Sequence, residues 1–156
     1  MEWIKNLSGA TIGLDTAPLI YFIEEKSPYL SVLEPFFAEM EKGSFLVSTS
    51  TITLLEVLVC PLRSGNYSLA SDYKDILLNS KMITIEISHP ISERAASLRA
   101  KHNIRTPDSL QISASLETGA AYFLTNDLRL PAIPSIEIIT LDSLVSFPKG
   151  HPSPTG

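Results

Sequence analysis

The chain has 156 residues, of which 44% are hydrophobic and 19% are charged, and its formal net charge is −5. This composition is typical of a single globular domain and is too rich in aliphatic residues for a disordered chain. The negative net charge excludes general electrostatic attraction to nucleic acid, so any such binding needs a local basic patch or a bridging metal ion.

Short β-like runs alternate with longer helical patterns along the chain. The predicted strands cover residues 11–15, 45–49, 82–87, 121–125 and 136–140. The predicted helices cover residues 18–24, 29–42, 50–60, 68–78, 92–102 and 106–118. Strands that alternate with helices favour the α/β class. We therefore predict a three-layer sandwich, in which helices flank a central parallel sheet of about five strands.

The same pattern predicts the domain organisation. Residues 1–146 form one predicted domain, and the Pro-rich residues 147–156 form a predicted disordered tail. Gly43 is expected to stop the helix over 29–42, and Pro61 lies near the expected end of the helix over 50–60.

The compartment follows from the N-terminus and the single cysteine. Residues 1–6 include an acid at position 2 and lack the apolar core of a secretion signal. No apolar run has the length of a membrane span. Cys60 has no partner for an internal disulfide, and its apolar surroundings in the sequence predict a buried thiol. We expect a cytoplasmic protein that does not contact membranes.

Four carboxylates occur where the predicted elements give them little structural reason to be. Asp15 and Asp127 each follow an apolar run at the end of a strand. Glu56 interrupts the apolar pattern of residues 52–60, and Asp108 begins a helix. Parallel sheets bind ligands beyond the carboxyl ends of their strands. At least three of the four acids are therefore expected at one edge of the sheet.

Each acid also has a structural explanation that the sequence leaves open. Asp15 can cap the first helix, and Asp127 lies in a turn-like sequence. Asp108 suits the first turn of a helix, where the helix dipole favours a carboxylate. Glu56 matches a capping box that begins at Thr53. This explanation is the weakest of the four, because a helix that starts at Ser50 puts Glu56 among apolar residues without Lys or Arg three or four residues away.

Charge repulsion limits what a cluster of these acids can be. Carboxylates about 5 Å apart repel by roughly 3 kcal/mol per pair at an effective dielectric constant of about 20. Six such pairs rival the stability of a whole domain, which is about 5–15 kcal/mol. A cluster therefore needs retained protons or a divalent cation. Oxygen ligands select a hard ion, Mg²⁺ or Mn²⁺.

Other chemistries have less support. The three histidines are not spaced as metal ligands, and the chain has no Gly-rich phosphate loop. A phosphotransfer function for Asp15 would need a second acid beside it, where the chain has Thr16, Ala17 and Pro18.

The four acids lie in segments that resemble the motifs of PIN-domain proteins, and specifically the VapC-type ribonuclease toxins. These segments are Leu14–Thr16 with Leu19–Tyr21, Thr53–Val57, Arg105–Gln111, and Phe123–Asp127 with Leu130. The resemblance covers residues 11–144. It implies a PIN-like fold and a Mg²⁺- or Mn²⁺-dependent endoribonuclease that hydrolyses RNA phosphodiester bonds, as the toxin of a toxin–antitoxin pair.

The resemblance also implies roles for individual residues. The implied catalytic and metal-binding residues are Asp15, Glu56, Asp108 and Asp127. The polar residues implied to orient these carboxylates or a metal-bound water are Thr16, Ser50, Thr125 and Asn126. Two positions depart from the family pattern: Arg129 stands where some relatives have a further acid, and Ala17 replaces a small polar residue.

Binding partners are predicted from the basic and apolar surfaces. The residues expected to bind RNA are Arg99, Lys101, Arg105 and Arg129, with a solvated helix face as the alternative. Family members dimerise, and the toxins are held by a small antitoxin. We expect residues 29–42 and 68–78 to supply apolar surface for such contacts. A catalytically silent PIN-like module that binds RNA or a protein partner is the alternative function.

Overall fold

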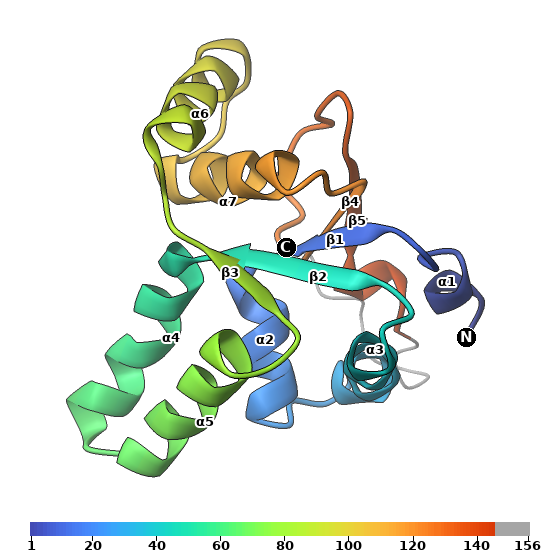
Figure 1. The fold of residues 1–156 in the computed structure, drawn as a ribbon, viewed down its shortest axis with the longest axis vertical. Helices are drawn as coiled ribbons and strands as arrows, with labels where there is room; N and C mark the ends of the chain where they lie inside the picture. Colours follow the sequence, from blue (N-terminus) through green and yellow to red (C-terminus); the bar gives the residue numbers. More distant parts are fainter. Residues whose placement is uncertain (146–156) are drawn as a thin grey trace, which may run out of the picture.

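The computed structural model describes residues 1–145, which form a parallel five-stranded sheet between helices (Figure 1). The strands lie in the order β3-β2-β1-β4-β5, and every neighbouring pair is parallel. Their bounds are Thr11–Leu14 for β1, Leu46–Ser50 for β2, Ile83–Ile85 for β3, Tyr122–Thr125 for β4 and Glu137–Thr140 for β5. The predicted α/β fold with a parallel sheet is confirmed, and the predicted tail over 147–156 lies outside the described residues.

Helices cover both faces of the sheet. In order they are α1 (Glu2–Lys5), α2 (Thr16–Ile23), α3 (Leu30–Lys42), α4 (Thr51–Ser64), α5 (Tyr67–Leu78), α6 (His89–Lys101) and α7 (Thr106–Glu117), followed by a short 3-10 turn, Leu141–Ser143. Figure 1 shows α7 above the sheet with α6 next to it, and α2, α3 and α5 on the opposite side. The sequence did not predict α1, which is only four residues long.

The two faces of the sheet carry separate clusters of buried hydrophobic residues. Leu14, Leu124 and Phe36 belong to the larger cluster, and Phe123 and Ile112 belong to the smaller one. Adjacent residues of β4 therefore face opposite sides of the sheet, as expected for a strand. The smaller cluster fixes α7 on the sheet.

The bounds of α4 are set by its caps. The Ser50 hydroxyl accepts a hydrogen bond from the Ile52 N–H at 3.1 Å, as a helix N-cap does. Gly65 ends the helix in the left-handed conformation, with φ of 71°. The helix runs through Pro61 and ends about one turn later than predicted. Pro61 lies inside the helix and lacks an N–H donor, but the glycine is the residue that ends the helix.

The outer side of α4 is exposed, which corrects two predictions. Cys60 is exposed, so the predicted buried thiol is wrong. Glu56 is exposed as well, whereas the buried side of the helix carries Thr53 and Val57. The helix presents further hydrophobic side chains to solvent, namely Leu55, Val59 and Leu62. The apolar pattern of α4 therefore indicated more burial than the helix has.

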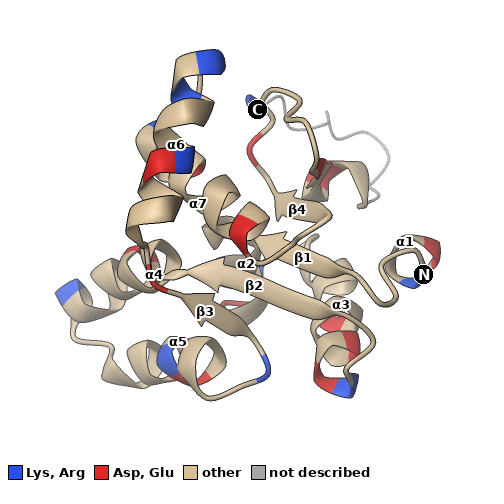
Figure 2. Ribbon diagram, turned by 45° about the horizontal axis from the view of Figure 1, so that its top comes forward, with Lys and Arg blue, Asp and Glu red and all other residues tan. Residues whose placement is uncertain are grey.

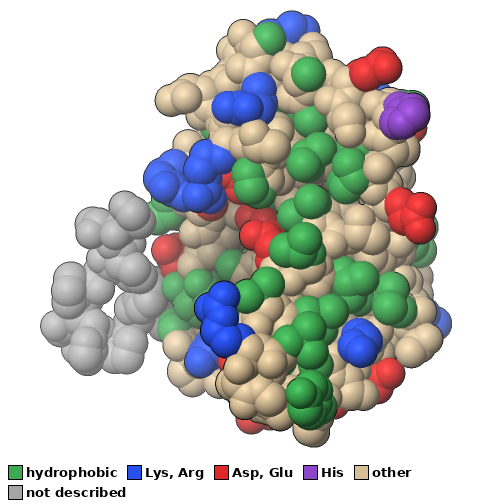
Figure 3. Space-filling model, turned by 90° about the vertical axis from the view of Figure 1, so that its left-hand side faces the viewer, with side chains coloured by type: hydrophobic (Ala, Val, Ile, Leu, Met, Phe, Trp, Pro, Cys, Tyr) green, Lys and Arg blue, Asp and Glu red, His purple; other side chains and the backbone are tan. Residues whose placement is uncertain are grey.

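The exposed apolar surface also differs from the prediction for α3. The large hydrophobic residues of this helix are packed in the core, including Phe36, Phe37 and Met40. The prediction holds better for α5, where Tyr67 and Leu78 are exposed. Figure 3 shows hydrophobic side chains gathered on one face of the molecule. None of the helices within residues 1–145 combines the length and apolar character of a membrane span.

Gly13 allows α7 to lie close to β1. A Cβ atom on this residue would overlap the Ser115 hydroxyl and would lie 2.5 Å from Ser115 Cβ. Ser115 is buried, and its hydroxyl donates to the Gln111 carbonyl at 3.0 Å. Rotation of the side chain would move the hydroxyl but not Cβ, so the overlap with Cβ would remain. The contact sets how closely α7 approaches the sheet, and Asp108 lies in the first turn of this helix.

We expect Gly13→Ala to destabilise the protein by about 1–3 kcal/mol, the usual range for overpacking a core. Equilibrium urea unfolding measures the effect. Ser115→Gly removes the opposing Cβ. Gly13→Ala should therefore lower the free energy of unfolding less in the Ser115→Gly variant than in the native protein. A Gly13→Ala variant as stable as the native protein would contradict the close packing of α7 on β1.

Candidate active site

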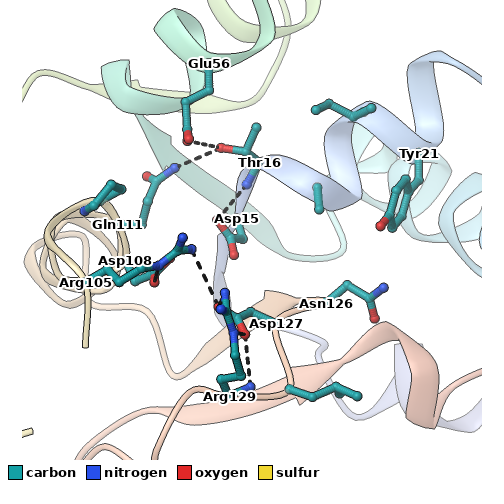
Figure 4. Close-up of a pocket in the computed structure, with 14 residues that line it drawn as sticks. Asp15, Thr16, Tyr21, Glu56, Arg105, Asp108, Gln111, Asn126, Asp127 and Arg129 are labelled. Carbon is teal, nitrogen blue, oxygen red and sulfur yellow. Dashed lines mark hydrogen bonds and ion pairs between the residues drawn. The ribbon is translucent and has the colours of Figure 1, made fainter. Parts of the chain in front are cut away.

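A pocket of about 540 Å³ lies where β1 and β4 end, and all four predicted acids line it. Asp15 follows β1, Asp127 follows β4, Asp108 lies in the first turn of α7, and Glu56 lies on α4 (Figure 4). In the sheet, β2 lies on one side of β1 and β4 lies on the other side, so the direction of strand order reverses at β1. Ligand sites in α/β sheets lie at such reversals of strand order. The structure thus brings the four acids together, and their chemical roles stay predictions.

Among the described residues, the Asp15 side chain accepts hydrogen bonds only from neutral groups. Its Oδ1 accepts from the Thr16 N–H at 2.8 Å, which caps α2, and its Oδ2 accepts from the Thr125 hydroxyl at 2.7 Å. Burial raises the pKa of Asp15, these two hydrogen bonds oppose the shift, and the charges of Asp108 and Glu56 add to it. Asp15 is therefore a helix cap and also a carboxylate whose ionised form is disfavoured in this pocket.

Glu56 is oriented by Thr16, whose hydroxyl donates to Oε1 at 2.7 Å. The same hydroxyl lies 3.3 Å from Nε2 of Gln111, which donates to it. Gln111 is buried, donates to the Thr53 hydroxyl at 2.6 Å and accepts from the Ser50 hydroxyl at 2.7 Å. One amide thus joins α7 to α2, β2 and α4, and it holds the hydroxyl that positions Glu56 (Figure 4).

Gln111 is the residue of this hydrogen-bond network to which the sequence assigned no role. It lies within the third motif segment, three residues after Asp108, so the two side chains share a face of α7. A polar residue on the buried face of a helix was the available signal, because a buried amide requires hydrogen-bond partners.

The four polar residues predicted to orient the carboxylates differ in how closely they contact them. Thr16 and Thr125 donate directly to Glu56 and Asp15. Ser50 acts one step away, since its hydroxyl donates to Gln111. Asn126 lines the pocket, but its amide group donates to the Tyr29 hydroxyl at 3.2 Å and accepts from the Asp142 N–H at 3.2 Å.

Asp127 has charged partners instead. The Arg129 N–H and Nε donate to Oδ1 at 2.9 and 3.0 Å, and Nη2 donates to Oδ2 at 3.2 Å. The side-chain hydrogen bond from Arg129 is the largest cause that lowers the pKa of Asp127. Arg105 lies between two acids, with Nε 3.1 Å from Asp108 Oδ2 and Nη2 3.9 Å from Asp127 Oδ2.

The donor groups of the pocket suit a hard divalent cation. They are carboxylate, hydroxyl and amide oxygens, which Mg²⁺ and Mn²⁺ prefer. Within residues 1–145 no three acidic, His or Cys side chains converge closely enough to hold one ion together. Mg²⁺ is commonly held by one or two carboxylates and several waters, so this spacing does not oppose binding. Asp15 and Glu56, which are bonded to neutral donors, are the residues that fit an ion best.

Three of the four predicted RNA-binding residues lie on one side of the pocket. Arg99, Arg105 and Arg129 line an adjoining hollow of about 310 Å³. Arg99 also holds the loop between α6 and α7, because it donates to the Ile104 carbonyl at 3.1 Å and to the Thr106 hydroxyl. Lys101 is exposed near the end of α6 and lines neither of these two hollows. Figure 2 shows Lys and Arg residues along α6.

Comparison with family models matches residues 12–136 to the PIN domain, so the chain belongs to the PIN-domain family. The resemblance stated from the motifs is confirmed. Comparison with curated protein sequences gives no match.

Three solved structures are similar to this chain. VapBC2 from Rickettsia felis, bound to a DNA fragment from its promoter, is 22% identical with a TM-score of 0.64, over 83% of this chain and 98% of that chain. A toxin–antitoxin complex from Klebsiella pneumoniae is 21% identical with a TM-score of 0.62, over 85% and 98%. VapC20 from Mycobacterium tuberculosis, a Sarcin-Ricin loop cleaving toxin, is 14% identical with a TM-score of 0.60, over 73% and 87%. At these identities the similarity establishes the fold.

The raised pKa of Asp15 predicts a specific pH dependence of stability. Above its ordinary pKa of 3.8 the unfolded chain loses this proton while the folded protein retains it. The free energy of unfolding contributed by Asp15 therefore falls as pH rises from about 3.8 through the folded-state pKa. Asp15→Asn has no proton to lose, so the native protein should lose stability relative to this variant between about pH 4 and neutrality.

Urea unfolding at a series of pH values, with chelator present, measures this difference. Asp72→Asn on the exposed surface of α5 is the matched control, because it removes the same charge outside the pocket. If the free energies of unfolding of the native protein and of Asp15→Asn differ by the same amount at every pH, the burial of this carboxylate does not destabilise the folded protein.

Proposed function

We propose that this protein is a metal-dependent endoribonuclease, and that it is the toxin of a toxin–antitoxin pair. The main support is Asp15, a half-buried carboxylate beside two other acids, whose hydrogen-bond partners are all neutral. A divalent cation removes the penalty for ionising such a group, and it also binds phosphate oxygens. Such an ion could serve several functions, and membership of the PIN-domain family favours nuclease activity.

Asp15 and Glu56 would hold the ion. When bound, the ion supplies a nucleophile by lowering the pKa of a water molecule. Thr125 and Thr16 fix the two carboxylates through their hydroxyl groups. Asp108 or Asp127, which also line the pocket, would accept a proton from that water.

The hollow lined by Arg99, Arg105 and Arg129 is the proposed path of the RNA strand. Guanidinium groups bind phosphate oxygens with two parallel hydrogen bonds. Arg105 lines both hollows, so a strand that follows the arginines passes directly beside Asp108. This placement answers the difficulty that the chain as a whole is negatively charged.

An antitoxin is part of the proposal. Two of the similar structures are toxin–antitoxin complexes. In this chain Leu55 and Val59 on α4 are exposed. Glu56 lies between them in the sequence and lines the pocket. A partner that covers this side of α4 would also reach the rim of the pocket. The proposed homodimer would use other surface, for which the exposed Tyr67 and Leu78 of α5 are candidates.

The proposed activity is tested with labelled structured and unstructured RNAs in Mg²⁺, in Mn²⁺ or in chelator. We expect cleavage only with metal, and we expect Asp15→Asn and Glu56→Gln to slow it on the order of 100-fold or more, the low end for a positioned catalytic group. Asp72→Asn and Glu137→Gln are matched controls, since both acids are exposed outside the pocket and the charge change is the same.

Cleavage that persists in both pocket variants would contradict the assigned site. A protein that binds the RNAs but cuts none of them with either metal would favour the alternative function, a catalytically silent module.

A further inference from the structure

The pocket contains positive charges of its own, supplied by Arg105 and Arg129. It is lined by four carboxylates and these two guanidinium groups, with no further charged side chain from the described residues. When all four carboxylates are ionised, two negative charges are left uncompensated, and one divalent cation supplies the matching charge. A second divalent ion would leave the pocket positively charged.

The two positive charges lie together at one end of the pocket. Arg129 donates to both oxygens of Asp127, and Arg105 lies between Asp127 and Asp108. Among residues 1–145, Asp15 at the centre of the pocket and Glu56 beyond it accept hydrogen bonds only from neutral donors. Figure 4 shows both guanidinium groups on the side of Asp127, Glu56 beside Thr16, and Asp15 between them.

Arg129 is well suited to remain on Asp127. It is only two residues away, and its own backbone N–H also donates to Oδ1, so the loop orients the side chain toward the carboxylate. The guanidinium fork matches a carboxylate, and little conformational entropy is lost when the two groups are already aligned. An ion arriving from water must instead give up part of its hydration shell.

We propose that Arg129 is the built-in counter-charge of Asp127, so that the pocket takes one divalent cation beside Asp15 and Glu56 and the guanidinium replaces a second ion. This inference rests on the proposed metal-dependent function. Only two of the five N–H donors of the guanidinium are used on Asp127. The side chain is 68% exposed, so the others can bind a phosphate that enters the pocket.

Titration of the RNA-free protein with Mn²⁺, followed by electron paramagnetic resonance of the unbound ion, tests the proposal. The native protein should bind one Mn²⁺. Arg129→Gln and Arg129→Met should acquire a second Mn²⁺ site or bind the second ion about 10-fold more tightly or better, the scale on which groups around metal ligands act. Arg129→Lys keeps the charge and should resemble the native protein.

Arg94→Gln is the matched control, because Arg94 forms an exposed ion pair with Glu117 away from the pocket. Two Mn²⁺ ions on the native protein, or a single ion on both Arg129→Gln and Arg129→Met, would overturn the role of Arg129 and leave the proposed nuclease intact. No Mn²⁺ on the native protein or on any variant would overturn the proposed function together with this inference. Circular dichroism of each variant identifies any that fail to fold. If one of Arg129→Gln and Arg129→Met does not fold, the other provides the test.

Discussion

The pairing of β1 with β4 is the constraint on which the site depends. The register places Leu14 beside Leu124, so Asp15 and Thr125 are the next residues on neighbouring parallel strands. The Asp15 N–H donates to the Leu124 carbonyl at 2.9 Å, and the Thr125 hydroxyl donates to the Asp15 side chain. A shift of one residue would point these side chains to opposite faces of the sheet. The strand register therefore fixes the carboxylate at the centre of the pocket.

Glu56 and Asp108 are held by helices that meet around this point. Gln111 on α7 bonds to hydroxyl groups on α2, β2 and α4, and it is buried where these elements meet. The close approach of α7 to β1 at Gly13 is what brings the amide within reach. Because a half-satisfied buried amide is costly, this network favours one arrangement of the helices. Rigidity of this kind is what a site needs if it is to hold like charges near one another.

The sequence pattern was sufficient to predict the fold and to place Asp15, Asp127 and Glu56 at one edge of the sheet. Asp108 was expected there only because its segment resembles a motif of PIN-domain proteins. Alternating strand and helix patterns identify a parallel sheet, and Asp15 and Asp127 each follow a strand that ends at the same edge. The exposure of Glu56 and Cys60 could not be predicted, because α4 has apolar residues on both its buried and its exposed side. The pairing of Arg129 with Asp127 depends on the path of a loop, which the periodicity of a sequence does not encode.

The central claim is that the acids form one anionic site that takes a hard divalent cation at Asp15. Diffraction from a crystal grown with Mn²⁺, using the anomalous signal of manganese, tests it most directly. The account predicts an anomalous peak in the pocket, in direct coordination contact with an Asp15 carboxylate oxygen. Manganese bound only at other acidic residues, with Asp15 still bonded to Thr16 and Thr125 alone, would contradict it.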